Sequence, residues 1–270
     1  MTKLALEFAS RQHVGTRENQ QDAFLVCEFN NQDRKVFLLA DGMGGHVAGE
    51  VAATRAIDAF AREMETLDAP AHLSFDRLLD KANRSIAREI RNNPGCNGMG
   101  CTFVALEMIA GHYSWISIGD SPLFLCENAK AKRLNADHSM ASRLDAAAQA
   151  GEISWEDARS SKSRNALLHA LVGTPITRMD WQRQAKLLAT GEWLVLASDG
   201  LETLSRDEIA SLISTNASLG VDIVADALLS AVLEKDNPLQ DNVSFFVIRL
   251  AQGTKNNSDQ ITTRTIKARA

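Results

Sequence analysis

Short apolar runs, each bounded by Gly, Asn, Asp or Pro, recur along the chain and predict at least eight β-strands. The predicted strands cover residues 5–10, 22–29, 35–41, 102–109, 113–120, 122–127, 192–199 and 243–250. Elsewhere apolar residues recur at spacings of three and four, a pattern that is typical of amphipathic helices. The predicted helices cover residues 47–65, 75–90, 207–214 and 221–234.

The order of these elements favours an α+β domain over a parallel sheet with a helix after every strand. The connection over residues 110–113 is short enough to indicate an antiparallel hairpin, and the helices come in pairs. We therefore predict one layered α+β domain over residues 1–252, with an insert at about 138–175. Residues 253–270 are polar and lack periodicity, so we expect a disordered tail there.

Composition and charge narrow the class of protein. The 270-residue chain is 45% hydrophobic and 23% charged, with a formal net charge of -5, as is usual for a globular protein. This charge argues against nucleic acid or an anionic membrane as a partner. The chain contains neither a signal-peptide pattern nor a run of about 18 apolar residues, so we expect a cytoplasmic protein without membrane insertion. The four cysteines lack zinc-site spacing, and we expect reduced core thiols.

Aspartates stand where five of the apolar runs begin or end. These residues are Asp22, Asp41, Asp120, Asp199 and Asp241. A single aspartate at such a place is explained as a turn or cap residue, but five strand ends can meet at one edge of a layered sheet. Carboxylates crowded in this way need cations, and Mg²⁺ or Mn²⁺ would be the natural choice because both prefer oxygen ligands. The sequence therefore predicts a metal site.

The stretch GMGGHVAG over residues 42–49 could also be taken for a nucleotide-binding loop. A dinucleotide fingerprint would need glycine at Val47, and a P-loop would need Lys followed by Ser or Thr. Glycine after Asp41 and after Asp199 instead allows the backbone to approach closely, so that a carbonyl group can reach a metal ion.

A set of motifs in this order resembles the bacterial branch of the metal-dependent Ser/Thr protein phosphatases, the type 2C class or PPM family. The motifs are GTRENQQDAF, LLADGMGGHVAGE, GCTFVAL, WISIGDSPLFL, ADHSMASRL, LASDGL and DNVSFFVI. The resemblance covers residues from about 8 to 250 and implies a stand-alone catalytic domain. It also implies a four-layer α/β/β/α sandwich of two antiparallel sheets flanked by paired helices, with the insert as a mobile flap beside the cleft that contributes to selecting substrates.

The resemblance implies roles for the aspartates as well. Asp41 would bridge two metal ions, and the carbonyl group of Gly42 would bind one of them. Asp199 and Asp241 would hold the other ion, while Asp22 would hold waters of the metal shell.

Two further residues match family positions. Asp120 resembles the residue that, with Asp199, holds a third and weaker metal ion in bacterial members, and Arg17 matches the arginine that grips the substrate phosphate. The catalytic set would thus be Arg17, Asp41 and Asp199. Two ions about 3.5 to 4 Å apart would convert a bridging water to hydroxide near neutral pH and stabilise an in-line transition state.

The implied function is hydrolysis of phosphoserine and phosphothreonine in proteins with two Mn²⁺ or Mg²⁺ ions, reversing Ser/Thr kinase signalling. The implied partners are phosphorylated substrates of a cognate kinase, and we expect a monomer. Small stand-alone members also occur beside secretion systems, so regulation of a secretion system is our hypothesis for the pathway.

The chain departs from the family pattern in several places. Gln20 and Gln21 stand where the family has Asn followed by Glu or Gln, and Thr203 stands where an aspartate is frequent. Met43 stands where eukaryotic members place a histidine proposed as the leaving-group acid, so a metal-bound water is the expected substitute. We interpret His46 as a structural residue at the entry of a helix.

Two other functions stay open at this point. A catalytically weak member could act as a phosphoprotein-binding module, although such a protein would be expected to lose metal aspartates that this chain keeps. A metal-dependent hydrolase of another phosphate ester, such as a nuclease, is the second alternative, but the chain has no basic stripe to bind nucleic acid.

Overall fold

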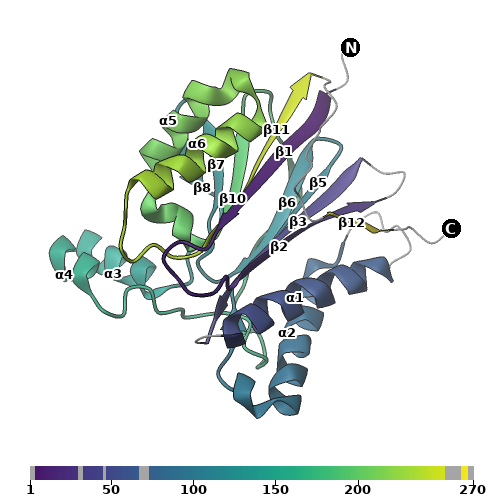
Figure 1. The fold of residues 1–270 in the computed structure, drawn as a ribbon, viewed down its shortest axis with the longest axis vertical. Helices are drawn as coiled ribbons and strands as arrows, with labels where there is room; N and C mark the ends of the chain where they lie inside the picture. Colours follow the sequence, from purple (N-terminus) through teal and green to yellow (C-terminus); the bar gives the residue numbers. More distant parts are fainter. Residues whose placement is uncertain (1–3, 30–32, 45–46, 67–72, 253–262, 267–270) are drawn as a thin grey trace.

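The structure, a computed structural model, describes residues 4–29, 33–44, 47–66, 73–252 and 263–266. Two β-sheets lie face to face, with helices on their outer sides (Figure 1). The first sheet contains, in spatial order, β1 (Leu4–His13), β11 (Val243–Gln252), β10 (Trp193–Ala197), β7 (Leu123–Glu127) and β8 (Lys130–Arg133). The second contains β12 (Thr263–Ile266), β2 (Asp22–Phe29), β3 (Arg34–Met43), β5 (Phe103–Ile109), β6 (His112–Ile118) and β9 (Asp180–Leu187), with β4 (Gly100–Cys101) beside β3.

The helices form two pairs and a smaller group in the insert. The pairs are α1 (Val47–Glu65) with α2 (Phe75–Asn92), and α5 (Arg206–Asn216) with α6 (Val221–Glu234). The insert carries α3 (Met140–Gln149) and α4 (Trp155–Ser160). Three short 3₁₀ helices complete the set, η1 (Pro94–Cys96), η2 (Asp199–Thr203) and η3 (Ala217–Leu219).

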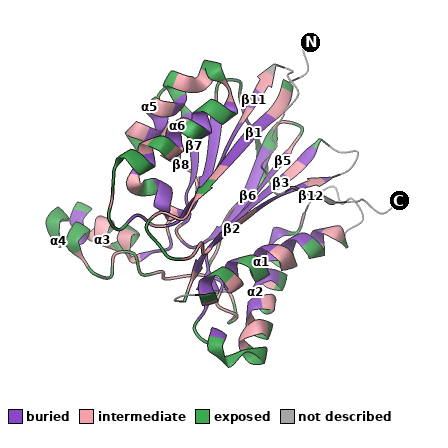
Figure 2. Ribbon diagram, in the orientation of Figure 1, coloured by how far each residue is buried: buried purple, intermediate pink, exposed green. Residues whose placement is uncertain are grey.

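Alternate side chains of the central strands enter different apolar layers. On β3, Val36 and Leu38 pack against α1 and α2, whereas Phe37 and Leu39 pack between the two sheets. On β10 and β11 the same alternation separates the layer between the sheets from the layer under α5 and α6. Because both faces of these strands are buried, their sequences read as unbroken apolar runs (Figure 2). The predicted four-layer sandwich is therefore confirmed.

All eight predicted strands and all four predicted helices are present, and the hairpin predicted at 110–113 joins β5 to β6. The prediction missed β8 and β9, whose sequences KAKR and DWQRQAKL carry charged and polar residues without apolar alternation. Both strands lie at sheet edges, where water covers one side and where charged residues discourage pairing with other chains.

The expectation of a disordered tail over 253–270 is wrong for Thr263–Ile266. This segment forms β12, which pairs in parallel with β2 so that Thr263 lies opposite Val26 and Ile266 opposite Phe29. The edge of β2 offers unpaired backbone groups, and a Thr- and Ile-containing segment is suited to a strand. The other tail residues, 253–262 and 267–270, lie outside the described residues.

The insert follows β8 and returns to the sheets at two isolated bridges, Ser139 with Leu167 and Cys101 with Leu171. Its helices α3 and α4 lie beside the end of the sandwich (Figure 1). Each buries a single alanine, Ala148 in α3 and Ala158 in α4. The two helices of the insert are therefore held by little apolar contact, in contrast to α1 and α2.

The expectation that the four cysteines are core thiols is confirmed, since all four are free and buried. Trp115 and Trp193 are only 5% and 3% exposed and also belong to the core. Within the described part of the chain, none of the helices combines the length and the apolar character that crossing a membrane requires.

Helix α1 begins where β3 ends, and the two backbones touch at a pair of glycines. A Cβ atom added to Gly42 would lie 2.2 Å from the carbonyl oxygen of Gly49 and 2.6 Å from that of Gln21. Both of these atoms belong to the backbone and cannot rotate away. The end of β3 therefore has room only for glycine.

We expect Gly42→Ala to lower the free energy of unfolding by about 1–3 kcal/mol, because the added methyl group overlaps backbone atoms on two sides. Urea denaturation followed by circular dichroism measures this change. Gly95→Ala is the matched control, since a Cβ atom there meets only the Asn93 Oδ1 atom, at 3.3 Å. Equal stability of the two variants would contradict the close approach.

Candidate metal centre

The structure brings the five predicted aspartates together at one end of the sandwich. Asp22 and Asp41 lie directly opposite each other in the register of β2 and β3. Asp41 shares the strand face of Phe37 and Leu39, so its side chain faces the space between the sheets.

The other three aspartates reach the same place from separate elements. Asp120 follows β6, Asp199 opens η2 directly after β10, and Asp241 precedes β11. Three strand ends from the two sheets therefore contribute one carboxylate each.

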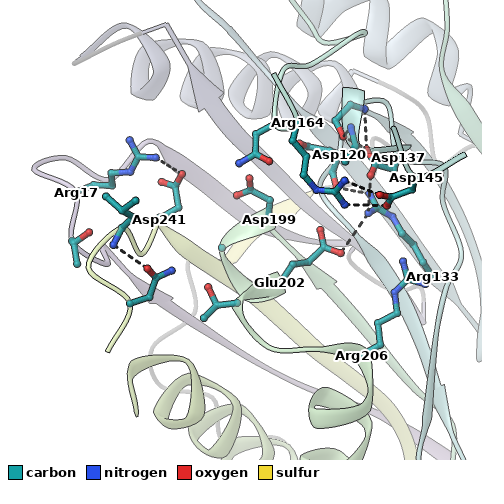
Figure 3. A pocket seen from close by; sticks show the side chains of 18 of the residues that line it. Arg17, Asp120, Arg133, Asp137, Asp145, Arg164, Asp199, Glu202, Arg206 and Asp241 are labelled. Atoms are coloured by element: carbon teal, nitrogen blue, oxygen red, sulfur yellow. Dashed lines mark hydrogen bonds and ion pairs between the residues drawn. The ribbon is translucent and has the colours of Figure 1, made fainter. Parts of the chain in front are cut away.

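Two adjoining cavities contain these groups. A cavity of about 500 Å³ is lined by Asp41, Asp120, Asp199 and Asp241, and also by Gly42. A larger cavity of about 910 Å³ shares three of these aspartates with it and extends toward α5 and the insert (Figure 3). Arg17 lines both cavities, as expected of a residue that would contact the same ligand as the aspartates.

Asp22 lies deepest and lines neither cavity. Its side chain accepts a hydrogen bond from Ser198 Oγ at 2.8 Å, but its Oδ1 atom is buried without a partner among the described residues. Burial raises the pKa of Asp22 to about 7, and the charges of Asp199 and Asp241 act in the same direction. A carboxylate in this setting calls for a nearby positive charge.

Asp41 and Asp199 are perturbed in the same way. Burial raises the pKa of Asp41 well above its usual range, and the charges of Asp22 and Asp199 add to the effect. Burial also raises the pKa of Asp199, followed by repulsion from Asp241. The Oδ1 atom of Asp199 is a second buried carboxylate oxygen without a partner in the described part of the chain.

Asp120 is held through its backbone. The guanidinium group of Arg133 donates a hydrogen bond to the Asp120 carbonyl oxygen and lies 3.6 Å from Glu202 and 3.8 Å from Asp137. Burial raises the pKa of Asp120 to about 7. Repulsion from Asp199 and Asp137 acts in the same direction and is larger than the opposing effect of Arg133, which lowers the pKa. Arg133 could not be predicted from spacing along the chain, because it lies in the short charged strand β8 and its partners come from other elements.

Arg17 forms an ion pair with Asp241, with Nη2 at 2.5 Å from Oδ2. The loop that carries Arg17 is fixed by Asn242, whose Nδ2 donates to the carbonyl oxygens of Val14 at 2.8 Å and Asn19 at 3.1 Å. This role of Asn242 was not predicted, although the residue is part of the motif DNVSFFVI.

The residues at which the chain departs from the family pattern form hydrogen bonds near the site or line its cavity. Gln20 accepts a hydrogen bond from the backbone N–H of Asp22 at 2.9 Å, and the carbonyl oxygen of Gln21 accepts one from Gly42 at 3.1 Å. Thr203 donates to Gln240 Oε1 at 2.7 Å. Met43 lines the 500 Å³ cavity. The interpretation of His46 falls outside the described residues.

The chemistry of the donors decides which ion would fit. Among the residues that the structure describes, no three His, Cys, Asp or Glu side chains converge closely enough to hold an ion unaided. Ions that keep several waters can still bind here, because the donors are carboxylates and the backbone of Gly42. Two carboxylate oxygens already lack partners in the described structure. The site therefore fits Mg²⁺ or Mn²⁺, and its described lining includes none of the thiolate or imidazole ligands that suit zinc.

The chain is similar in sequence to a known protein family and to named members of it. The sequence profile of the family described as Protein phosphatase 2C matches residues 9–234. The serine/threonine protein phosphatase PstP of Mycobacterium tuberculosis is 30% identical over 209 residues, which cover 76% of this chain and 38% of that protein. The serine/threonine phosphatase stp of Listeria monocytogenes is 33% identical over 193 residues, 70% of this chain and 74% of that protein.

A solved structure supports the match. The catalytic domain of PstP in complex with two manganese ions has a TM-score of 0.72 and 26% identity, and the match covers 92% of this chain and 99% of that one. The match to full-length PstP, by contrast, covers only 38% of that protein, so this chain spans well under half of its length. Because the family profile matches 9–234 of 270 residues, the chain belongs to the protein phosphatase 2C family.

Proposed function

We propose that this protein hydrolyses phosphoserine and phosphothreonine in other proteins, using two Mn²⁺ or Mg²⁺ ions. The observation that carries the proposal is the cluster of five aspartates, four of which share a cavity with Arg17, together with the unpartnered carboxylate oxygens of Asp22 and Asp199. Its relatives are named serine/threonine phosphatases, and one was solved with two manganese ions. The retained aspartates also argue against a catalytically weak binding module.

In this proposal Asp41 would hold both ions, the Gly42 carbonyl group would hold one of them with it, and Asp199 and Asp241 would hold the other. Asp22, which is buried and lines neither cavity, would hold waters of the metal shell. Two divalent ions would lower the pKa of water toward neutrality and stabilise the negative charge that develops during phosphoryl transfer. A third ion would use Asp120 together with Asp199.

Arg17 would hold the phosphate group of the substrate. Its side chain is 56% exposed and its ion-pair partner is Asp241, which belongs to the proposed metal ligands. When Asp241 binds an ion, the guanidinium group becomes available for two parallel hydrogen bonds to phosphate oxygens. This geometry orients the phosphoester beside the aspartates.

The leaving serine or threonine oxygen needs a proton. No described histidine lines either cavity, and Met43 offers no proton. We infer that water supplies this proton. Phosphoproteins, the products of a Ser/Thr kinase, are the substrates that this chemistry implies.

The first test uses a small aryl phosphate with Mn²⁺ or with a chelator. We expect chelation to abolish hydrolysis, and Asp41→Asn and Asp199→Asn to lower kcat/KM at least about a hundredfold, because each removes a charge that holds the ions. Asp58→Asn is the control, since Asp58 lies on α1 and pairs with Arg62 away from the site. Full activity in the chelator would disprove the mechanism, and a phosphopeptide assay then separates a protein phosphatase from a general phosphatase.

Arg17→Gln should raise KM for a phosphopeptide about tenfold, because a bidentate charged contact with the phosphate is lost. Arg17→Lys should recover only part of the loss, since lysine keeps the charge but not the paired donors. Steady-state kinetics at saturating Mn²⁺ measures both effects. An unchanged KM in both variants would show that Arg17 does not bind the phosphate.

The raised pKa values predict how stability depends on pH in the metal-free protein. Asp22 and Asp120 have a pKa of about 7 when folded, above the value of about 3.9 for an unfolded chain. The folded protein therefore keeps protons that the unfolded protein releases, and these groups lower the free energy of unfolding as pH rises toward about 7.

Denaturation in a chelator should accordingly show falling stability between about pH 5 and pH 7, and saturating Mn²⁺ should reverse the loss by about 2–3 kcal/mol. Asp22→Asn should flatten the pH dependence, because it removes one of the titrating groups. Stability that rises over this range in the metal-free protein would contradict the arrangement of the carboxylates.

A further inference from the structure

Four arginines line the 910 Å³ cavity, and three of them have acidic partners (Figure 3). Arg17 pairs with Asp241 at 2.5 Å. Arg164 binds both carboxylate oxygens of Asp145, at 2.7 Å and 3.0 Å.

Arg133 is the third arginine with acidic partners. Its Nη1 atom lies 3.6 Å from a carboxylate oxygen of Glu202 and 3.8 Å from one of Asp137. Asp137 also accepts hydrogen bonds from the backbone N–H of Ser139 at 2.8 Å and its Oγ at 2.6 Å. Among the described acidic residues that line the cavity, only Asp120 and Asp199 have a carboxylate that pairs with none of these three arginines. Both belong to the proposed metal centre.

Arg206 is the fourth arginine, and it forms no hydrogen bond or ion pair with any described residue. It is the first residue of α5, is exposed, and extends from the start of that helix toward Glu202 and Arg133 (Figure 3). Its guanidinium carbon lies 5.9 Å from the centre of the Phe124 ring, a distance that permits a weak cation–π contact. Arg206 is thus a cation on the wall of the cavity that no described carboxylate contacts directly, although its charge acts on Asp145 and Glu202.

The cavity is larger than a phosphate group needs. A volume of about 910 Å³ is typical of sites that hold a whole small molecule, whereas the phosphoryl group would occupy only the end beside the aspartates. The remaining space, which Arg206 lines, can accept side chains that flank the phosphorylated residue of a protein substrate.

We propose that Arg206 is a specificity-determining residue that binds an anionic group, a carboxylate or a second phosphate, close in sequence to the phosphorylated residue of the substrate. The inference rests on the proposed function and names its substrate class: phosphoproteins whose dephosphorylation site has acidic neighbours. A free cation in a partly enclosed site favours such a group, and a basic neighbour would be repelled.

The experiment compares phosphothreonine peptides that differ at one flanking position. Glu, phosphoserine, Gln or Lys is placed at each flanking position in turn, and kcat/KM is measured with saturating Mn²⁺. The readout is the ratio of the anionic peptide to the Gln peptide, so that a general change in activity cancels. We expect a ratio of about three to five for the wild type at the best position, as an exposed ion pair supplies.

Three variants of Arg206 test the assignment. Arg206→Gln should bring the ratio of the anionic to the Gln peptide to about one. Arg206→Glu should lower this ratio below one and make the Lys peptide the better substrate. Arg206→Lys should keep most of the wild-type ratio, as expected for charge recognition. Arg88→Glu on α2, outside both cavities, matches the charge change of Arg206→Glu and should keep the wild-type ratio. The Glu and phosphoserine arms show which anion is preferred.

The outcomes separate this inference from the proposed function. If the wild type does not hydrolyse phosphopeptides at all, the proposed function fails. If it hydrolyses them without preference for an anionic neighbour, or if Arg206→Gln and Arg206→Glu keep the wild-type ratio, the role of Arg206 is disproved and the proposed function stands. A loss of the preference in Arg88→Glu would also disprove the role, because net charge would then explain it.

Discussion

The structure depends on keeping several carboxylates close together at the buried end of two sheets. Each charge in such a place is disfavoured both by the loss of water and by its neighbours, and burial is the larger cause for Asp22, Asp41, Asp120 and Asp199. Burial of apolar side chains offsets this cost elsewhere in the fold. Three apolar layers fix both sheets, so the strand ends that carry the aspartates cannot move apart to relieve the repulsion.

The hydrogen bonds around the site fix the backbone and leave carboxylate oxygens available. The backbone N–H of Asp41 donates to Thr102 Oγ1 at 2.9 Å, and that hydroxyl group lies 2.7 Å from Ser121 Oγ. Asn242 likewise accepts a hydrogen bond from the backbone N–H of Gln21 at 2.7 Å. Because these contacts use backbone groups, the position of each aspartate is fixed while unpartnered oxygens remain for an ion.

The parts of the fold that the sequence could predict are those set by local pattern. Unbroken apolar runs identified the buried strands, and the aspartates where five of these runs begin or end identified the proposed site. The edge strands β8 and β9 were missed because a half-exposed strand needs no apolar run. Arg133 and Arg206 were missed for a related reason: their role depends on which residues of other elements lie within reach, and spacing along the chain carries no such information.

The arginines of the cavity differ in how readily they can exchange partners. The side chain of Arg133 is 8% exposed and is held by Asp120, Asp137 and Glu202 together, so releasing it would break a backbone hydrogen bond and two ion pairs at once. The side chain of Arg17 is 56% exposed and, among the described residues, forms an ion pair only with Asp241, so an ion held by Asp241 would release Arg17 at little cost. In the proposed function, metal binding and phosphate binding would therefore be coupled through one carboxylate: the ion that adds positive charge to the centre would also release the guanidinium group that holds the substrate.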